Sequence, residues 1–505
     1  MSGSDAILVG IDIGTTNLKA VALHPDGRVA AVVRRPMVVR SGGAGATEFD
    51  LDALDRDLLG ALRELVDRLA AEGVAPVRIA GIGVASIGES FVGLDREGRR
   101  VSPCPTWYDR RTTNRRADWG LSPAHWFEIT GMVDDDIYTV HRIGWWRTAG
   151  ADWPGRVHRW MLVADYATFL LCGQVVGSPS LAARSGLADR RDGRWSGEIL
   201  GHAGLDVASL PELRPAGSPA GTLLREVGKA TGLPVGLPVV NAGHDHPCAG
   251  LGCGLVDPGG MIDSTGTSEA LKTVVDRALT YDEVGGGRYD CYPHAVPGRF
   301  LLSGHVPASG GLLDWLVKLL SGPSPAPDAV RELWRLAALS PPGANGVRVA
   351  PFLQGTGAPW NQRARRAGIA SLGGASGPGD VLRAGVEALA AWLAVNLEAF
   401  EAIAGVRPRQ VTLAGGGARN ALANAIKAAF LDRPFVIPDV AEAAGAGAAL
   451  VAGLGVGLFP DATAAAALGG IGRQAVPVDP ALAAAYAGLR DEIVLHLKAE
   501  AGAHG

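Results

Sequence analysis

Near its start the chain reads Ile11-Asp12-Ile13-Gly14-Thr15-Thr16-Asn17-Leu18-Lys19-Ala20-Val21, which predicts a β-branched strand, a small polar turn and a return strand. In the second half, Met261-Ile262-Asp263-Ser264-Thr265-Gly266-Thr267-Ser268 repeats this plan. Glycine lets the backbone approach a phosphate, threonine hydroxyls and turn N–H groups donate to its oxygens, and aspartate can hold hydrated Mg²⁺. One such hairpin would be explained by an ordinary turn, but the second copy predicts two related domains that face one nucleotide.

Length and charge set the broad class of protein. The chain has 505 residues, of which 47% are hydrophobic, and this is ample for two sizeable domains. Glycine and proline punctuation around residues 234–259 places the boundary there, so we expect domains at 1–253 and 254–505. A net charge of −4 and a pI near 6.3 give no basic field for nucleic acid or an anionic membrane, and neither is an expected partner.

The cellular location follows from segments that the sequence lacks. Residues 1–6 are polar and run into a strand without a charged and then apolar leader, so we expect a cytoplasmic protein. Five scattered cysteines suit reduced thiols better than a disulfide framework. Residues 443–459 carry no charge, but their glycine and alanine content favours a tightly packed helix inside the protein over a membrane span.

Hydrophobic periodicity predicts an α/β protein. Strands are expected near 7–13, 18–23, 29–39 and 79–85, with a helix at about 52–72 and a terminal helix at 481–499. The region between Trp107 and Trp195 is rich in tryptophan. We expect most of these indoles in the core and a few at a pocket, since indoles pack against sugar C–H faces.

A third motif is Gly415-Gly416-Gly417-Ala418-Arg419-Asn420, between a β-rich segment and an amphipathic helix at 421–431. Three glycines remove side chains that would block a flat ring, and they place helix-start N–H groups beside a ligand. Adenine or ribose fits such a place, although a plain strand-to-helix turn has the same composition. The motif lacks the spacing of the dinucleotide fingerprint, which disfavours a nicotinamide cofactor.

A fourth motif is Asn241-Ala242-Gly243-His244-Asp245-His246-Pro247, which follows a β-rich pair. An acidic group at the end of a strand is where an α/β fold presents a catalytic side chain, so Asp245 is the expected general base. The flanking histidines suggest a metal site as an alternative. If the strand continued, alternation would put His244 and His246 on the side opposite to Asp245, which disfavours that alternative.

Together these motifs, with Glu442 to Gly453, resemble the FGGY carbohydrate kinases, the family of xylulokinase and glycerol kinase, over nearly the whole chain. The resemblance implies α/β architecture with two actin-like ATPase (ribonuclease H-like) domains flanking a nucleotide cleft, with ATP and Mg²⁺ as cofactors. Asp12 would anchor the Mg²⁺ waters and Asp245 would deprotonate the sugar hydroxyl. The matching nucleotide-binding positions are Gly14, Thr15, Thr16, Lys19, Thr265, Gly266, Thr267, Gly310, Gly415, Gly416, Gly417 and Asn420.

The segment Ser86-Ile87-Gly88-Glu89 lies where xylulokinases carry Met-His and glycerol kinases Arg-Glu, and neither pair is intact. Since Gly88 replaces the arginine, we expect a wider pocket for a longer substrate. Carboxylates accept hydrogen bonds from hydroxyls and repel anions, which favours a neutral ketose or polyol. The acidic run 134–136 belongs either to this group or to a solvated loop. The expected substrate contacts are Glu89, Trp107, Asp109, Arg110, Tyr138, His246 and Glu269.

We therefore predict a carbohydrate kinase that transfers the γ-phosphoryl group of ATP to a hydroxyl of a neutral ketose or polyol. The alternative is an actin-like ATPase acting as a chaperone or filament protein, which the Gly-His-Asp-His segment and the tryptophan-rich region disfavour. The sequence leaves open which sugar and which hydroxyl react. It also leaves the oligomeric state open, with a homodimer suggested by family analogy.

Overall fold

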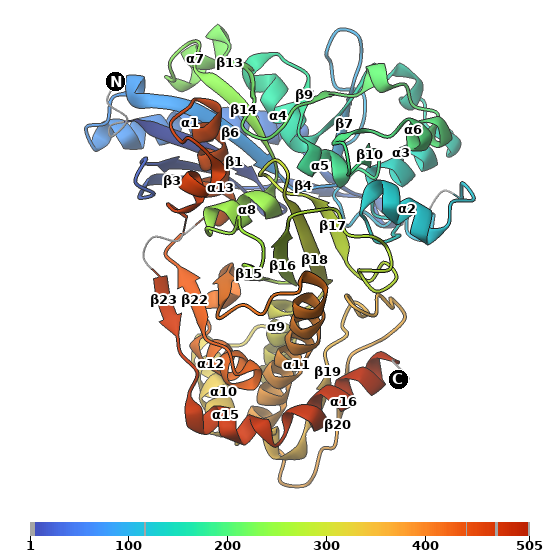
Figure 1. Cartoon of the computed structure of the whole chain (residues 1–505), viewed down its shortest axis with the longest axis vertical. Coiled ribbons are helices and arrows are strands. Elements are labelled where there is room, and N and C mark those ends of the chain that lie inside the picture. The colour runs from blue at the N-terminus through green and yellow to red at the C-terminus, as the bar shows by residue number, and fades with distance from the viewer. Residues whose placement is uncertain (1–5, 116–117, 441, 470–472, 503–505) are drawn as a thin grey trace.

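Two sheets with one strand pattern organise the two halves of the chain (Figure 1). The structure is a computed structural model that describes residues 6–115, 118–440, 442–469 and 473–502. The first sheet has the order β13 (Pro219–Thr222), β14 (Pro238–His244), β6 (Ile79–Ser86), β1 (Ile7–Ile13), β2 (Asn17–Leu23), β3 (Val29–Pro36). The second has the order β17 (Asp290–Pro293), β18 (Phe300–Val306), β16 (Glu269–Val275), β15 (Met261–Thr265), β21 (Val411–Ala414), β22 (Phe435–Pro438), β23 (Arg473–Val476).

The pairing directions show that the second sheet repeats the first. β1 is antiparallel to β2 and parallel to β6, which is parallel to β14. In the same way, β15 is antiparallel to β16 and parallel to β21, which is parallel to β22. Each glycine–threonine hairpin therefore joins the two central antiparallel strands of its sheet, and the α/β class predicted from the sequence is confirmed.

Helices and short strands surround the sheets. The first half has α1 (Leu51–Ala71), α2 (Pro123–Thr130), α3 (Thr139–Thr148), α4 (Val163–Cys172), α5 (Pro179–Ala183), α6 (Gly197–Ala203), α7 (Arg225–Thr231) and α8 (Asp245–Gly252). The second has α9 (Gly310–Ser321), α10 (Pro327–Leu339), α11 (Pro378–Ala404), α12 (Ala421–Leu431), α13 (Ala443–Gly455), α14 (Ala462–Ala466), α15 (Pro480–Ala487) and α16 (Arg490–Ala501). Short pairs are β4 (Val39–Ser41) with β5 (Thr47–Phe49), β7 (Phe91–Leu94) with β8 (Arg159–Leu162), β9 (Val176–Gly177) with β12 (Glu212–Leu213), β10 (Ala188–Asp189) with β11 (Arg194–Trp195), and β19 (Arg348–Ala350) with β20 (Gly368–Ala370).

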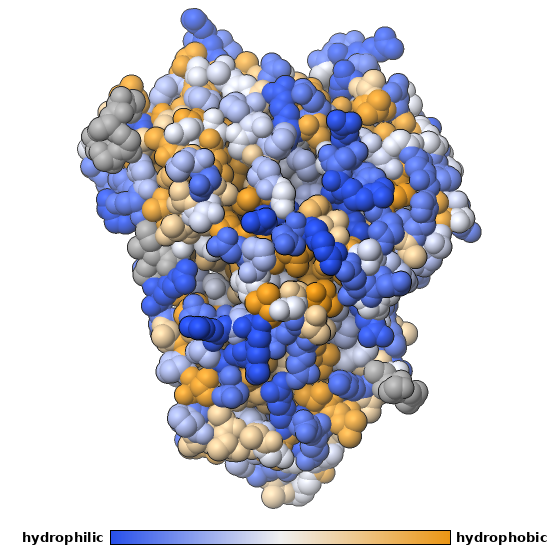
Figure 2. Space-filling model, in the orientation of Figure 1, coloured by the Kyte–Doolittle hydropathy of each residue, from blue (hydrophilic) through white to orange (hydrophobic). Residues whose placement is uncertain are grey.

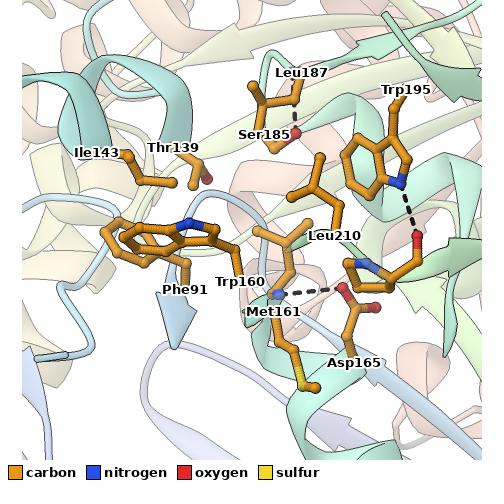
Figure 3. Close-up of a pocket in the computed structure, with 12 residues that line it drawn as sticks. Phe91, Thr139, Ile143, Trp160, Met161, Asp165, Ser185, Leu187, Trp195 and Leu210 are labelled. Atoms are coloured by element: carbon orange, nitrogen blue, oxygen red, sulfur yellow. Dashed lines mark hydrogen bonds between the residues drawn. The ribbon is translucent and has the colours of Figure 1, made fainter. Parts of the chain in front are cut away.

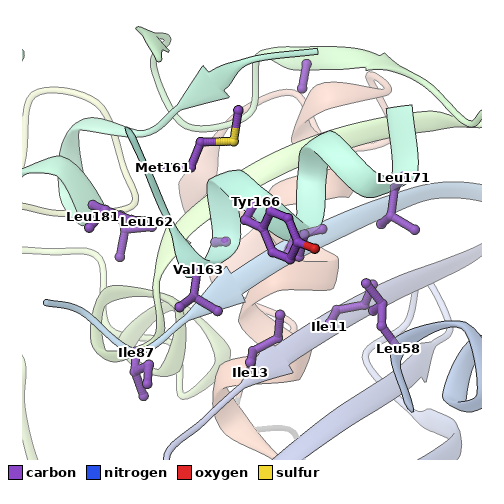
Figure 4. Packing of buried hydrophobic residues seen from close by; sticks show 14 of the residues in the cluster. Ile11, Ile13, Leu58, Ile87, Met161, Leu162, Val163, Tyr166, Leu171 and Leu181 are labelled. Carbon is purple, nitrogen blue, oxygen red and sulfur yellow. The ribbon is translucent and has the colours of Figure 1, made fainter. Parts of the chain in front are cut away.

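The first core forms between the sheet and its covering helices. Asp50 caps α1 by accepting from the backbone N–H groups of residues 52 and 53, and the leucine face of the helix turns inward. Ile11 and Ile13 of β1, Leu58 of α1 and Tyr166 of α4 belong to one buried cluster (Figure 4). Most tryptophans between 107 and 195 join this cluster, as expected, including the buried Trp126, Trp146 and Trp160. Burial of these large side chains stabilises the first half of the chain.

Helix α13 belongs to the second half of the chain but packs on the first sheet and on α8 (Figure 1). The contact requires glycine. A Cβ at Gly447 would lie 1.8 Å from the carbonyl oxygen of Cys248 in α8, and one at Gly10 would lie 1.8 Å from that of Gly445. The uncharged segment 443–459 is thus a tightly packed interior helix with its following turn, as predicted, and it couples the two halves.

The expected terminal helix at 481–499 is wrong in one respect, because α15 and α16 are separate helices that break at Gly488. The two helices dock on different partners: α15 packs on α12, and α16 packs on α11 and β19. Glycine is a weak helix former, so tertiary packing redirects the chain there at little cost.

The surface on the face shown in Figure 2 mixes polar residues with scattered apolar ones. The five cysteines are buried and unpaired, as predicted. Among the described residues, none of the helices is long and apolar enough to cross a membrane.

Candidate active site

Asp245 stands at the junction of β14 and α8, where the strand ends at His244 and the helix begins. Its side chain is 16% exposed, and its Oδ1 has no hydrogen-bond partner although it lies 3.1 Å from His244 Nε2. Burial and the nearby Asp12 carboxylate together raise the pKa of Asp245 to about 8, against the opposing Lys272 ammonium. A carboxylate with an unpaired oxygen and a pKa near neutrality can take a proton from an alcohol.

The two histidines do not lie opposite Asp245, as strand alternation would have required. Because the helix starts at Asp245, the ligand atoms of His244, Asp245 and His246 lie within 4.8 Å of one another. Burial lowers the pKa of both histidines well below the usual range, so both rings are neutral near pH 7. The arrangement places His246 beside the candidate base.

The first hairpin carries an ion network that is partly exposed to solvent. Lys19 Nζ lies 3.1 Å from Asp12 Oδ2 and 2.9 Å from Glu442, the residue that precedes α13. Burial raises the pKa of Asp12, while Lys19 opposes the rise. The second oxygen of Asp12, Oδ1, is buried without a hydrogen-bond partner. An unpaired carboxylate oxygen of this kind fits a hydrated cation.

Trp107, one of the predicted substrate contacts, binds the turn of the first hairpin. Its Nε1 donates a hydrogen bond to Thr15 Oγ1 at 2.9 Å. The turn itself is closed by the Gly14 N–H, which donates to the Asn17 carbonyl at 3.0 Å, and Thr16 is exposed at its tip. Of the tryptophans named above, Trp107 thus contacts the candidate phosphate hairpin directly.

The second hairpin is held between two other elements. The N–H groups of Gly310 and Gly311, at the start of α9, donate to the carbonyls of Gly266 and Thr267 at 2.9 and 3.0 Å. On the other side lies the triple-glycine loop, where a Cβ at Gly415 would be 2.4 Å from the Thr265 carbonyl oxygen and one at Gly417 would be 2.5 Å from Thr265 Oγ1. At Gly416 the nearest atom would be 3.6 Å away. Asn420 caps α12 by accepting from the Ala423 N–H.

These contacts explain the glycines structurally. Two of the three glycines let the loop lie directly against the hairpin, and Gly416 faces more open space. The structure therefore brings together Thr265, Gly266, Thr267, Gly310 and the glycine loop, as the sequence predicted.

A buried ion network stabilises the two strands of the second hairpin. Lys427 of α12 lies 3.2 Å from Asp263 and 2.6 Å from Glu269, and Ser309 donates to Glu269 at 2.6 Å. Burial and the Glu269 charge together raise the pKa of Asp263 to about 7, against the opposing Lys427 ammonium. Glu269 thus contacts a lysine and a serine of the second half, and these contacts do not support its expected role beside a sugar.

Glu89 is the centre of a second cluster. It has a left-handed backbone (φ 62°) and is buried, and such strain in a side chain other than glycine is often found at functional sites. The guanidinium of Arg184 donates to Glu89 Oε1 at 2.7 Å and to Asp290 of β17 at 3.1 Å. The aromatic rings of Tyr138 and Tyr292 lie 5.5 and 5.6 Å from the same guanidinium.

The wider pocket expected from Gly88 is wrong. A Cβ at Gly88 would lie 2.7 Å from Cβ and 2.9 Å from Cγ of Arg184, so the side chain of Arg184 fills the space that glycine leaves. Arg184 lies directly after α5, nearly a hundred positions after Gly88 in the sequence. An arginine–glutamate pair is therefore present, but the arginine comes from another element.

Other predicted contacts have structural partners. Burial alone would raise the pKa of Asp109, but hydrogen bonds from Arg111 and from the Thr47 N–H hold it below its usual value. Arg110 is exposed. The acidic run is not free in solvent, because Arg363 of the second half pairs with Asp135 and, at 3.0 Å, with Asp136. The Asp135 charge also contributes to the raised pKa of Asp290, so the run lies near the Glu89 cluster.

Sequence reasoning missed four residues of these clusters, namely Arg184, Lys272, Asp290 and Lys427. Lys272 had a readable signal, since it is the one basic residue of the otherwise largely apolar strand β16. Lys427 had the same signal in the apolar helix α12. Arg184 and Asp290 had none, because each is placed only by tertiary structure.

A separate apolar cavity lies in the first half (Figure 3). Its lining includes Phe91, Trp160, Met161, Trp195 and Leu210, and the Trp195 indole donates to the Pro211 carbonyl at 2.7 Å. Asp165 at its edge is used structurally, since it accepts hydrogen bonds from the Asn241 side chain at 2.7 Å and from the Leu162 N–H at 3.1 Å. The cavity is part of the tryptophan core, and none of the predicted site residues lines it.

Family models match both halves of the chain. The chain matches the models for the FGGY family of carbohydrate kinases, N-terminal domain at residues 7–252 and C-terminal domain at residues 262–456. L-fuculokinase from Escherichia coli is 28% identical over 462 residues, covering 90% of this chain and 93% of that protein. Glycerol kinase from Citrifermentans bemidjiense is 29% identical over 483 residues, covering 93% and 94%.

Among solved structures, xylulose kinase from Rhodospirillum rubrum is 26% identical and covers 98% of both chains with a TM-score of 0.87. The expected pair of actin-like domains is thereby confirmed. Nothing in these matches favours the alternative of a chaperone or filament protein.

Proposed function

Because the chain belongs to the FGGY family of carbohydrate kinases, we propose that it transfers the γ-phosphoryl group of ATP to a hydroxyl of a neutral ketose or polyol, with Asp245 as the general base. It is an ATP-dependent phosphotransferase that acts on an alcohol group of a sugar. The observation that carries the proposed role of Asp245 is its position at the start of α8, with one unpaired carboxylate oxygen and a pKa raised to about 8 by burial.

The choice of a neutral substrate rests on the charges around Glu89. The Arg184 guanidinium is already compensated by Glu89 and Asp290, so it carries little excess charge to attract an acidic sugar. Glu89 uses Oε1 for Arg184, and its other oxygen can accept from a sugar hydroxyl. The names of the relatives given above refer to three different substrates, fuculose, glycerol and xylulose, so the substrate of this chain has to be found by assay.

The proposed roles of the hairpins follow from their contacts. Thr15, Thr16, Thr265 and Thr267 with their turn N–H groups would bind phosphate oxygens, and the start of α9 at Gly310 supports the second turn. Asp12 would hold a hydrated Mg²⁺ through its unpaired Oδ1, and the ion when bound neutralises charge on the phosphates. Asp245 takes the hydroxyl proton, and Trp107 with the surrounding side chains limits the access of water.

The decisive experiment combines a substrate screen with one variant. Purified protein with ATP and Mg²⁺ is assayed against pentuloses, hexuloses, pentitols, tetritols and glycerol. With the best substrate, Asp245→Asn should lower kcat by at least about a hundredfold while ATP binding, measured by calorimetry, changes little. Near-normal turnover would remove Asp245 from the role of base, and ATP hydrolysis independent of any sugar would contradict the substrate class.

The proposal also includes a cytoplasmic homodimer whose domains divide after residue 253. The five buried free thiols are consistent with a reducing compartment. Light scattering of the purified protein tests the oligomeric state.

A further inference from the structure

Lys272 is a buried lysine without a partner. It lies in β16, is only 2% exposed, and makes no hydrogen bond or ion pair with any residue that the structure describes. An unpaired ammonium in a protein interior is costly, because it loses hydration and gains nothing in return. Such a group is kept where a ligand supplies the missing negative charge.

The other lysines show that this is unusual within the chain. There are six lysines, of which Lys229, Lys318 and Lys498 are exposed. Lys19 contacts two carboxylates, and Lys427 contacts another two. A lysine that only stabilised the fold would be expected to have partners like these, and Lys272 has none.

The register of the sheet shows which way Lys272 points. Its cross-strand partner on β15 is Ile262, and Val274 follows two residues later, so all three side chains lie on one face. Ile262 and Val274 belong to the apolar cluster that includes Cys253, the residue after α8. The alternate residue, Leu271, belongs to the cluster of the second half. Lys272 therefore points away from its own domain core, toward α8 and the first half.

The charged groups that interact with Lys272 show which part of the candidate active site it lies near. Burial lowers its pKa to about 8, and the charge that most opposes this is Asp245, followed by Asp263. The Lys272 charge in turn contributes to the lowered pKa values of His244, His246 and His305. His305 is exposed on the neighbouring strand β18. Lys272 thus faces the histidines and the candidate base from the opposite domain.

We propose that Lys272 binds an anionic oxygen of the ligand at Asp245, and that this oxygen belongs to the phosphoryl group in transit. The inference rests on the proposed kinase function. The sugar oxygen forms a bond to the γ-phosphorus, the bond from that phosphorus to the β–γ bridging oxygen breaks, and the hydroxyl proton goes to Asp245. Lys272 keeps its protons and compensates the charge on a non-bridging oxygen. A carboxylate of an acidic sugar has the same chemistry and is the second source to be tested.

Lys272→Met tests this assignment, with Lys318→Met as the exposed control for the same chemical change. Methionine has a similar length and no charge, so the unliganded variant should melt at or above the temperature of the wild type. Thermal shifts with inorganic phosphate and with gluconate then probe the anion site without turnover. We expect phosphate to stabilise the wild type and the control but not Lys272→Met, and kcat on the best neutral substrate to fall by about 10²–10³-fold in that variant.

The outcomes separate the two sources. Loss of gluconate stabilisation with unchanged turnover of neutral sugars would assign the anion to a substrate carboxylate. If neither anion stabilises the wild type, or if Lys272→Met keeps both shifts and full turnover, the proposal is overturned. A wild type that phosphorylates no sugar but loses its phosphate shift in Lys272→Met would refute the proposed function and leave the anion site standing.

Discussion

Replacing Arg184 by alanine should damage both stability and sugar binding. The guanidinium bridges Glu89 of the first half and Asp290 of the second, and the side chains of Arg184 and Glu89 are only 13% and 6% exposed. Truncation leaves two carboxylates without their cation in a poorly solvated place. Removing one partner of a buried ion pair costs about 3–5 kcal/mol, whereas a surface pair is worth about 0–1 kcal/mol.

The cost should depend on pH. Burial already raises the pKa values of Glu89 and Asp290, with Arg184 opposing the rise, so loss of Arg184 raises both further. A carboxyl group whose pKa is higher in the folded than in the unfolded state contributes stability at low pH and loses it as the pH rises through the folded value. We therefore expect the variant to be close to wild type at pH 5 and destabilised by about 3 kcal/mol at pH 8.

Thermal unfolding between pH 5 and pH 8 measures this difference, and steady-state kinetics measure the effect on the sugar. The KM for the sugar should rise by about 10–100-fold, corresponding to about 1.4–2.8 kcal/mol, because Glu89 loses the group that orients it. Arg184→Lys should be intermediate, since a point charge cannot replace the planar fork. Arg191→Ala is the matched control, because Arg191 is 58% exposed and pairs with Asp189 at the surface.

A swap variant tests whether the position of the arginine matters. Gly88→Arg alone should unfold or inactivate the protein, since its Cβ would meet Arg184 at 2.7 Å. Combined with Arg184→Gly, which frees that space, Gly88→Arg should recover part of the sugar affinity lost in Arg184→Gly alone. If Arg184→Ala has the melting temperature of the wild type at every pH and an unchanged KM, the reasoning fails.

Two further predictions concern the base and the helix contact. Because burial and the Asp12 charge raise the pKa of Asp245 to about 8, the deprotonated fraction of the base grows with pH and is half at that value, so kcat/KM should rise with pH until about 8; a flat profile from pH 6 to pH 9 would contradict the assignment. Gly447→Ala, with its Cβ 1.8 Å from the Cys248 carbonyl oxygen, should cost about 1–3 kcal/mol, whereas Gly144→Ala in α3, with no atom within 4 Å, should stabilise by about 0.5–1 kcal/mol. Equal melting temperatures of these two variants would mean that α8 and α13 are not in close contact.

The sequence was informative where local chemistry decides structure. The hairpin strands, the helix at 421–431 and the interior helix at 443–455 follow from periodicity, turn residues and glycine content, and each of them lies within a few residues of its predicted limits. The same rules place Asp245 at the end of a strand. They also put the glycine loop between β21 and α12, where it rests on the second hairpin.

The errors share one physical cause, which is contact between residues far apart in the chain. Arg184 fills the space above Gly88, and Arg363 pairs with the acidic run more than two hundred positions away. Glu269 has the composition of a sugar contact, but Lys427 holds it inside the second half. A sequence pattern that spans a few residues cannot encode such a distant partner. The surroundings of these side chains could therefore be learned only from the folded structure.

The duplicated scaffold is used differently in its two copies. Asp12 of β1 and Asp263 of β15 each lie near the end of the strand that leads into the hairpin turn, and each is held by a lysine and accompanied by a glutamate. In the second copy the lysine is 5% exposed and comes from α12, so the network is sealed and can only support its hairpin. In the first copy Lys19 is 24% exposed and comes from the hairpin itself. Of the two networks, only the one at Asp12 is open to solvent, so we expect the cation and the reacting phosphate to lie beside Asp12. Lys272 points toward this region from the other domain.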